Sequence, residues 1–432
     1  MGSLAWVSNG LPVESGGGGS AMHWPAGQRI ALVGSLVLGV LAIAATGLPQ
    51  STLADPLPVS FVLRTQIPLH PSPRALAVGD FNRDGRIDLA VVNGSAATVS
   101  ILFGTGNGKF VAPRAVRVPA NADSIAVSYI NGGGKEDLVV GATTHASGSI
   151  TALLGGGDGS FGKRHTYPLG YRAGIRNAGT VSVTDVNGDQ SPDIVAARGS
   201  RVMVLLGRGD GTCRAARAYL ADANGSIASF ALGKLNGDAA PDVVAGSQEG
   251  VNTPAGALST MFGAAGGFGR ARTTATGLLI PDKLALHDVD HDGKLDLVVA
   301  NTADVMDYGS GGQNHAAIVV SLGLGDGSFS RLAEYDFGTL GPSALKLADF
   351  NGDGNVDLLA ASGEGLDLLL GNGDGSFEAA DRFDATPRVG GALVAVGDFD
   401  NDGQPDLAVA AASGDQLSIF LNRTGAAKAE RP

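Results

Sequence analysis

Acidic side chains recur in this sequence at a spacing that could hold a metal ion. Between Asp80 and Asp88, side-chain oxygens fall at positions one, three, five and nine, on Asp80, Asn82, Asp84 and Asp88. A tight loop turns alternate residues inward, and the backbone carbonyl at position seven, Arg86, can supply another ligand. Calcium is a hard cation that takes six to eight oxygens, and carboxylates this close would repel one another without a cation. The spacing therefore predicts a calcium-binding loop.

Four further segments repeat this pattern, and with the first we call them the intact loops. Their predicted ligands are, in chain order, Asp185, Asn187, Asp189, Ser191 and Asp193; Asp288, Asp290, Asp292, Lys294 and Asp296; Asp349, Asn351, Asp353, Asn355 and Asp357; and Asp398, Asp400, Asp402, Gln404 and Asp406. Position six needs a left-handed backbone, which glycine adopts without strain. Gln190 occupies that position in one loop, so we expect this loop to be the weakest of the five.

Two segments, 129–137 and 234–242, have lost part of the pattern, and we call them the worn loops. Tyr129 and Gly133 replace acids in one, and Lys234 replaces the first acid in the other, where its ammonium could stand in for an ion. We expect no metal in either. For the intact loops the alternative is that the aspartates only form Asx-turns. Turns alone do not require three or four carboxylates within nine residues, which argues against this alternative.

The loops belong to a longer repeat that predicts the fold. The ninth-position aspartates lie 49 to 61 residues apart and mark seven units. In each unit an alternating strand precedes the loop and a continuous apolar strand follows it. A third strand, a glycine-rich turn such as 371–377 and a more polar fourth strand complete the unit. Four strands in about 50 residues is typical of a propeller blade. We therefore predict an all-β fold, a seven-bladed β-propeller of four-stranded antiparallel blades.

The chain divides into five predicted segments: a disordered leader (1–28), an apolar segment (29–48), a linker (49–56), the propeller (57–424) and a disordered tail (425–432). The last unit lacks a fourth strand, and 61–67 resembles the fourth strand at 110–116, so we expect an N-terminal strand to close the ring and remove its open edge. The apolar segment would form a helix, either a signal peptide or a membrane anchor. We favour the signal peptide, because the segment ends in small residues. Both predict a secreted, periplasmic or surface-exposed protein.

Composition excludes several classes of partner and site. The formal net charge is −12 and the sequence has no basic cluster, which argues against binding of nucleic acid or an anionic membrane surface. A single cysteine, Cys213, excludes an intramolecular disulfide and a cysteine-rich zinc site. Five calcium ions would nearly neutralise the formal charge.

With these loops and turns in view, the chain resembles the FG-GAP/VCBS repeat family, whose best-known fold is the seven-bladed propeller of the integrin α-subunit head. The resemblance covers about residues 57–424. It implies that calcium lies between the first and second strands of a blade, in a structural role, on Asp80, Asn82, Asp84, Asp88 and their counterparts. It also implies that partners dock on the face opposite the calcium. Only five loops are intact, and no later integrin domains follow.

The resulting functional prediction is a monomeric binding or adhesion module for a protein or glycan, not an enzyme. Its contact surface would be the variable loops at 162–179, 247–256 and 301–315, because such loops on a rigid scaffold are where binding usually evolves. Both tryptophans, Trp6 and Trp24, lie in the leader, so the propeller has few stacking platforms for sugars, which disfavours a lectin. The rival class is a polysaccharide lyase using His145, His165 or His315 as a base.

Overall fold

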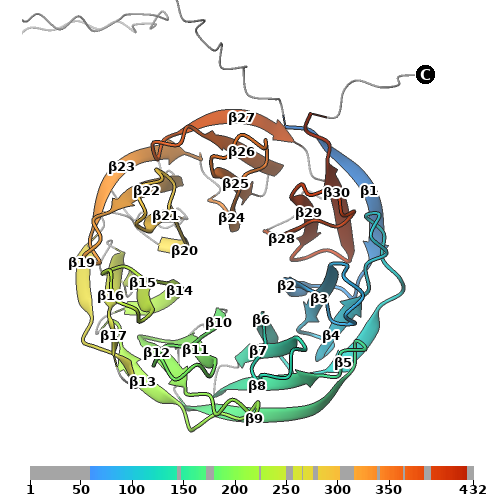
Figure 1. The fold of residues 1–432 in the computed structure, drawn as a ribbon, viewed down its shortest axis with the longest axis horizontal. Coiled ribbons are helices and arrows are strands. Elements are labelled where there is room, and N and C mark those ends of the chain that lie inside the picture. The colour runs from blue at the N-terminus through green and yellow to red at the C-terminus, as the bar shows by residue number, and fades with distance from the viewer. Residues whose placement is uncertain are drawn as a thin grey trace, which may run out of the picture. The chain divides into compact units, whose positions relative to one another are not determined.

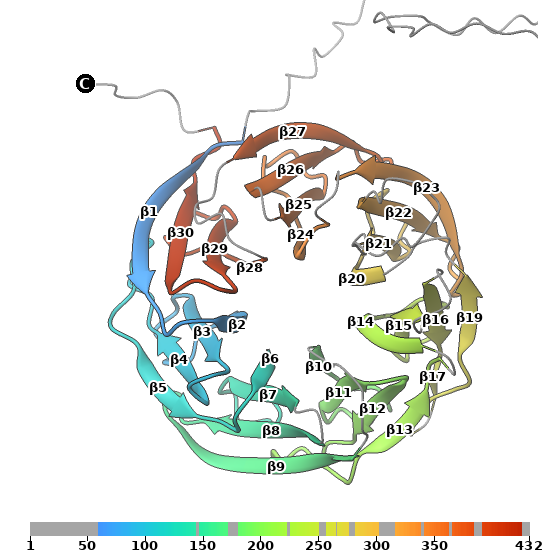
Figure 2. The same cartoon turned by 180° about the vertical axis from the view of Figure 1, so that it is seen from behind.

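The computed structural model describes residues 59–425 apart from ten short gaps, at 144–146, 172–179, 223–224, 250–255, 265, 276–280, 302–315, 338–340, 363–364 and 384–390. Seven antiparallel four-stranded sheets stand around a common centre (Figure 1). The reverse view shows the same succession of sheets (Figure 2). The predicted all-β, seven-bladed architecture is therefore confirmed.

Every blade places its strands in sequence order from the centre outward, except the last, whose outermost strand is the first in the chain. The innermost strands are β2 (Pro73–Gly79), β6 (Ala122–Ser128), β10 (Val181–Thr184), β14 (Gly225–Gly233), β20 (Pro281–His287), β24 (Ala344–Ala348) and β28 (Ala392–Gly397). The second strands are β3 (Asp88–Asn93), β7 (Asp137–Thr143), β11 (Asp193–Arg198), β15 (Asp242–Glu249), β21 (Asp296–Asn301), β25 (Asp357–Ser362) and β29 (Asp406–Ala411).

The third strands are β4 (Thr98–Leu102), β8 (Ser147–Gly155), β12 (Arg201–Leu205), β16 (Ala257–Met261), β22 (Ala317–Gly323), β26 (Gly365–Gly371) and β30 (Gln416–Asn422). The outermost strands are β5 (Arg114–Arg117), β9 (Phe161–Tyr171), β13 (Arg217–Leu220), β19 (Arg272–Ala275), β23 (Phe329–Asp336), β27 (Phe377–Phe383) and β1 (Phe61–Pro68). A small hairpin, β17 (Gly263–Ala264) with β18 (Gly267–Phe268), occupies the turn of the fourth blade.

The core lies between the blades. The second strand of a blade is covered on both faces, and β3, β11, β21, β25 and β29 are buried at every residue, which explains their continuous apolar sequence. Buried apolar side chains form seven clusters, and each cluster joins two neighbouring blades. Each blade is therefore stabilised mainly by its two neighbours, as expected for a repeat array.

The two ends of the described chain meet in one sheet. Strand β1 pairs antiparallel with β30, from Phe61 opposite Asn422 to Pro68 opposite Gln416, in the sheet β1-β30-β29-β28. The N–H of Arg423 also donates to the carbonyl of Ser60 (2.7 Å). The expected leader, apolar segment and linker lie outside the described residues. No helix in the described ranges is long and apolar enough to cross a membrane.

One predicted loop is a strand. Residues 162–171, in the predicted loop 162–179, belong to β9, so Arg164, His165 and Tyr167 lie on an outer strand. The Tyr167 hydroxyl accepts the N–H of Cys213 (2.8 Å) and thereby joins two blades. The sequence prediction failed because long outer strands are polar and half exposed, as loops are. Residues 250–255 and 302–315, with His315, and also His145 lie outside the described residues.

Candidate calcium loops

The first aspartate of each intact loop organises the loop backbone. In the first loop, Asp80 accepts the N–H of Asp84 at Oδ1 (3.1 Å) and that of Gly85 at Oδ2 (2.9 Å). The Oδ2 bond to position six recurs in the other four loops, at 2.7–3.0 Å. The fifth-position aspartate accepts the N–H of position seven, as Asp84 does from Arg86 (3.0 Å). The five loops thus share one hydrogen-bonded frame.

The left-handed backbone predicted at position six is confirmed. The φ values there are +76° at Gly85, +84° at Gly293, +91° at Gly354 and +85° at Gly403. Gln190 takes the same conformation (+65°) with a side chain attached, which is strained. Position four is also left-handed, for example at Arg83, His291 and Asn401, which was not predicted. No glycine marks position four in these three loops.

The ninth-position aspartate ties its loop to the end of the third strand. Asp88 is fully buried, and it accepts the N–H of Phe81 at Oδ2 (3.0 Å) and that of Gly104 at Oδ1 (2.8 Å). The same two bonds occur in six of the seven units, including the worn loop of Asp242. In the other worn loop Asp137 keeps only the bond from Gly155 (2.8 Å). We call this pair of bonds the aspartate clasp.

Burial of the clasp aspartates affects their protonation. It raises the pKa of Asp88, Asp193, Asp357 and Asp406 to about 6, although the clasp bonds themselves act to lower it. The charges of other loop aspartates contribute to the same rise in pKa. A buried carboxylate close to other carboxylates is stabilised in its charged form by a nearby cation. The loops therefore fit a bound calcium ion on electrostatic grounds.

Two intact loops bring three carboxylates together. Single oxygens of Asp288, Asp290 and Asp296 lie within 4.8 Å of one another, and so do those of Asp398, Asp400 and Asp406. The other three intact loops have asparagine at position three. There the amide oxygen accepts the N–H of position five, and the amide nitrogen donates to the position-five carboxylate, at 2.9–3.1 Å. In two loops three of the predicted carboxylate ligands thus lie close together, and in the other three the predicted ligands at positions three and five are hydrogen-bonded to each other.

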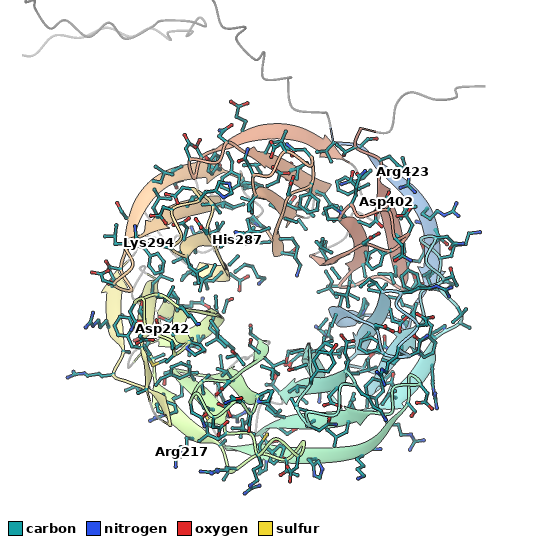
Figure 3. The ribbon with its side chains drawn as sticks, viewed as in Figure 1. Arg217, Asp242, His287, Lys294, Asp402 and Arg423 are labelled. Carbon is teal, nitrogen blue, oxygen red and sulfur yellow. The ribbon has the colours of Figure 1, made fainter. Side chains whose placement is uncertain are left out.

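The last intact loop contains a cation from the protein itself. Arg423 follows β30, and its guanidinium contacts Asp400 Oδ2 and Asp402 Oδ2, the latter at 2.6 Å (Figure 3). Its hydrogen bond to Asp400 raises the pKa of Arg423. The Asp400 side chain is only 10% exposed, and Asp400 Oδ1 and Gln404 Oε1 have no hydrogen-bond partner. Lys294 pairs with one acid of its own loop, Asp292 (2.6 Å), whereas Arg423 contacts two acids of the last loop and so balances more of its charge.

The worn loops keep their shape without the missing acids. In one, Asp238 still accepts the N–H of Ala240 (2.9 Å). Lys234 is exposed and forms no ion pair within the described ranges, so its ammonium does not stand in for an ion there. In the other, the Tyr129 hydroxyl donates to Glu136 (3.4 Å). In both loops an asparagine at position three accepts the N–H two residues on, Asn131 from Gly133 (2.7 Å) and Asn236 from Asp238 (3.1 Å), so the turn is kept.

The loops also connect neighbouring blades. A glycine in the turn between third and fourth strands donates its N–H to the second residue of the preceding blade's loop. These bonds run from Gly108 to Phe399 (2.9 Å), from Gly159 to Phe81 (2.9 Å) and from Gly327 to Leu235 (2.8 Å). The turns and the acidic loops thus lie together on one face of the ring. We call it the loop face.

Comparisons with known proteins agree with this architecture. A solved lectin structure from Agrocybe aegerita, described as recognising non-reducing terminal N-acetylglucosamine, is 18% identical, with a TM-score of 0.53, and the match covers 80% of this chain and 87% of the lectin chain. That likeness concerns the fold. No curated protein matches this sequence. The profile of the FG-GAP-like repeat matches residues 80–140, 185–245, 288–360 and 349–409, which is more than half of the chain and includes all seven loops. The chain therefore belongs to the family of proteins built from FG-GAP-like repeats.

Proposed function

We propose that this protein is an exported, calcium-stabilised binding module whose partner docks on the face opposite the loop face. The observation that carries the proposal is the difference between the two faces. The loop face is tied together by aspartate clasps and by hydrogen bonds between blades. On the other face, the connection between second and third strands varies from two residues, after Arg198, to fifteen, after Asn301. A rigid face and a face of variable loops suit a scaffold that presents a binding surface.

A glycan is the first partner to test. The lectin with a similar fold recognises terminal N-acetylglucosamine, which supports a glycan for this chain as well. The scarcity of tryptophan argued against sugar stacking, but sugars can also be held by polar side chains on variable loops. No cluster of histidine with paired carboxylates was found among the described residues to favour the lyase alternative.

Calcium would act as a structural ion. We propose that the intact loops bind it with dissociation constants of about 0.1–1 mM, as extracellular calcium modules do. The apolar segment at 29–48 supports export to a compartment where calcium reaches that concentration. An ion that binds only the folded state raises stability by mass action. Strand β1 would also stabilise the folded state, because its pairing with β30 supports the expected closure of the ring.

Two measurements on the full chain test the proposal. The first is the melting temperature in calcium and in chelator, with isothermal titration to count ions; a rise in calcium with four or five bound ions is expected. The second is binding to a panel of immobilised glycans that includes terminal N-acetylglucosamine. An unchanged melting temperature would refute structural calcium. Absence of binding to every glycan on the panel would refute the glycan as partner.

A further inference from the structure

Basic residues that are far apart in the sequence lie on the outermost strands of the first four blades. Each contributes two exposed cations, on the strand or just before it: Arg114 and Arg117 at β5, Lys163 and Arg164 at β9, Arg214 and Arg217 at β13, and Arg270 and Arg272 at β19. These strands follow one another along the perimeter of the ring (Figures 1 and 2). We call these eight residues the basic arc.

The basic arc contains no acidic residue. Strands β5, β9, β13 and β19 lack aspartate and glutamate altogether. The outer strands of the next blades differ: β23 has Arg331 beside Glu334 and ends at Asp336, and β27 begins Phe377-Glu378. Outer strands with basic residues and no acidic residues thus follow one another on one side of the ring. It was invisible in the sequence because successive pairs lie roughly 50 residues apart, which is the length of a blade.

The cations of the arc are available to a partner. Within the described ranges none of the eight forms an ion pair. Four have weaker partners. Arg217 donates to the carbonyl of Gly266 (3.4 Å), and Arg272 lies 4.7 Å from the ring centre of Phe262. The charges of Arg114, Arg214 and Arg272 also act at longer range on Asp158, Asp189 and Asp326 in the nearby turns and loops. Arg217 projects outward from the ring in Figure 3. The protein has a formal net charge of −12, so a basic surface without ion pairs is unusual on it and points to an anionic ligand.

We propose that the basic arc binds an acidic polysaccharide, a linear chain of sugars bearing carboxylate or sulfate groups. The proposal rests on the glycan partner of the proposed function and assigns it a charge and a second surface. Pairs of cations repeated from blade to blade along a perimeter match a polymer that repeats its charge along its length. Guanidinium groups bind carboxylates and sulfates with two parallel hydrogen bonds, which suits the arginines that make up most of the arc.

A nucleic acid fits the same surface less well. Duplex DNA carries one charge about every 1.7 Å, a density that pairs of cations separated by the width of a blade do not match. Single strands are held largely by aromatic stacking. The exposed large apolar side chains beside the arc are aliphatic, Val111 and Leu220. A polysaccharide with one acid group per one or two sugars meets neither obstacle.

The test compares hyaluronan with uncharged dextran as ligands of the full chain in calcium. We expect hyaluronan to bind, dextran not to bind, and the hyaluronan affinity to fall roughly tenfold between 50 and 200 mM NaCl. The fourfold variant Arg114→Gln, Arg117→Gln, Lys163→Gln and Arg164→Gln should lose at least about tenfold in affinity. The control pair Arg74→Gln and Arg331→Gln changes exposed cations off the arc, and should bind within about twofold of the original chain.

Three results would overturn the proposal: no hyaluronan binding, equal loss in the fourfold variant and the control, or tighter binding of duplex DNA than of hyaluronan. Melting temperatures check that the variants fold. The proposed function is tested separately by calcium stabilisation and by the panel of uncharged glycans. If the chain binds uncharged glycans but the fourfold variant binds hyaluronan as well as the control does, only the inference about the basic arc is refuted. If neither uncharged glycans nor hyaluronan bind, the glycan partner of the proposed function is refuted as well.

Discussion

The loop of Asp357 is intact and the loop of Asp242 is worn, yet the same two clasp bonds secure both. Asp357 accepts N–H groups from Phe350 and Gly371, both at distances of 2.8–2.9 Å, and Asp242 accepts them from Leu235 and Gly263, both at 2.8 Å. They differ at position one, where Asp349 organises one loop and Lys234 stands exposed in the other. The ninth aspartate is therefore a structural residue in its own right. In our proposal, the other acidic positions would distinguish a loop that binds calcium from a turn.

Loss of the clasp should have the largest effect. Asp242→Ala leaves the buried N–H groups of Leu235 and Gly263 without an acceptor, which costs about 1–3 kcal/mol each, so we expect about 4 kcal/mol of lost stability. Urea unfolding should give the same loss in calcium and in chelator. Asp357→Ala should lower the free energy of unfolding by the same amount as Asp242→Ala in chelator, and by a larger amount in calcium. A calcium-dependent loss for Asp242→Ala would mean that the worn loop binds metal, and would end the distinction.

The first position provides the matched pair of substitutions. Asp349→Ala should remove one ion from the stoichiometry and about 1.4 kcal/mol of stability when calcium stands tenfold above its dissociation constant. Lys234→Ala, at the same place in a worn loop, should change neither. Isothermal titration counts the ions, and melting in calcium reports the stability. If Lys234→Ala alters the count, the side chain has a role at that loop that its exposed position does not explain.

The last loop differs from the other intact loops because one guanidinium, that of Arg423, contacts two of its acids. Arg423→Gln should increase the calcium affinity of this loop by about tenfold, since the ion would no longer compete with a guanidinium. In chelator the same change should cost about 0.5–1 kcal/mol, the value of a surface ion pair. Titration over a wide calcium range separates this site from the others. A fall in affinity would show that Arg423 assists the ion rather than competing with it.

The smallest change in stability is expected at position six of the one intact loop that has glutamine there instead of glycine. Gln190→Gly removes a side chain from a left-handed backbone, so we expect a gain of about 0.5–1 kcal/mol. The reciprocal change Gly354→Gln should lose a similar amount. Melting curves in chelator measure both, without the contribution of the ion. A loss in Gln190→Gly would mean that the glutamine side chain makes a contact worth more than the strain.

The fold could be predicted from the sequence because the same pattern of strands and loop occurs in each of the seven repeats. Seven aspartates at even spacing located seven second strands, and each of these strands begins at the predicted aspartate. The site was less predictable. The clasp joins Asp88 to Gly104, sixteen residues away, and Arg423 reaches Asp402 from twenty-one residues away, so local spacing could not reveal either. The basic arc escaped notice for the same reason. The loop at 162–171 was misassigned because an exposed outer strand has the composition of a loop.

The meeting of the chain ends has a consequence for topology. Ser60 and Arg423 are hydrogen-bonded to each other, and β1 completes the sheet that ends with β30. The apolar clusters join neighbouring blades, including the last with the first, so the blades depend on their neighbours and not on chain order. Circular permutants of residues 60–423, with Ser60 and Arg423 joined by a short glycine-serine bridge and new ends placed in another connection between blades, should assemble the same blades. Such permutants would move the genetic terminus, and any fused label, to any chosen position around the perimeter.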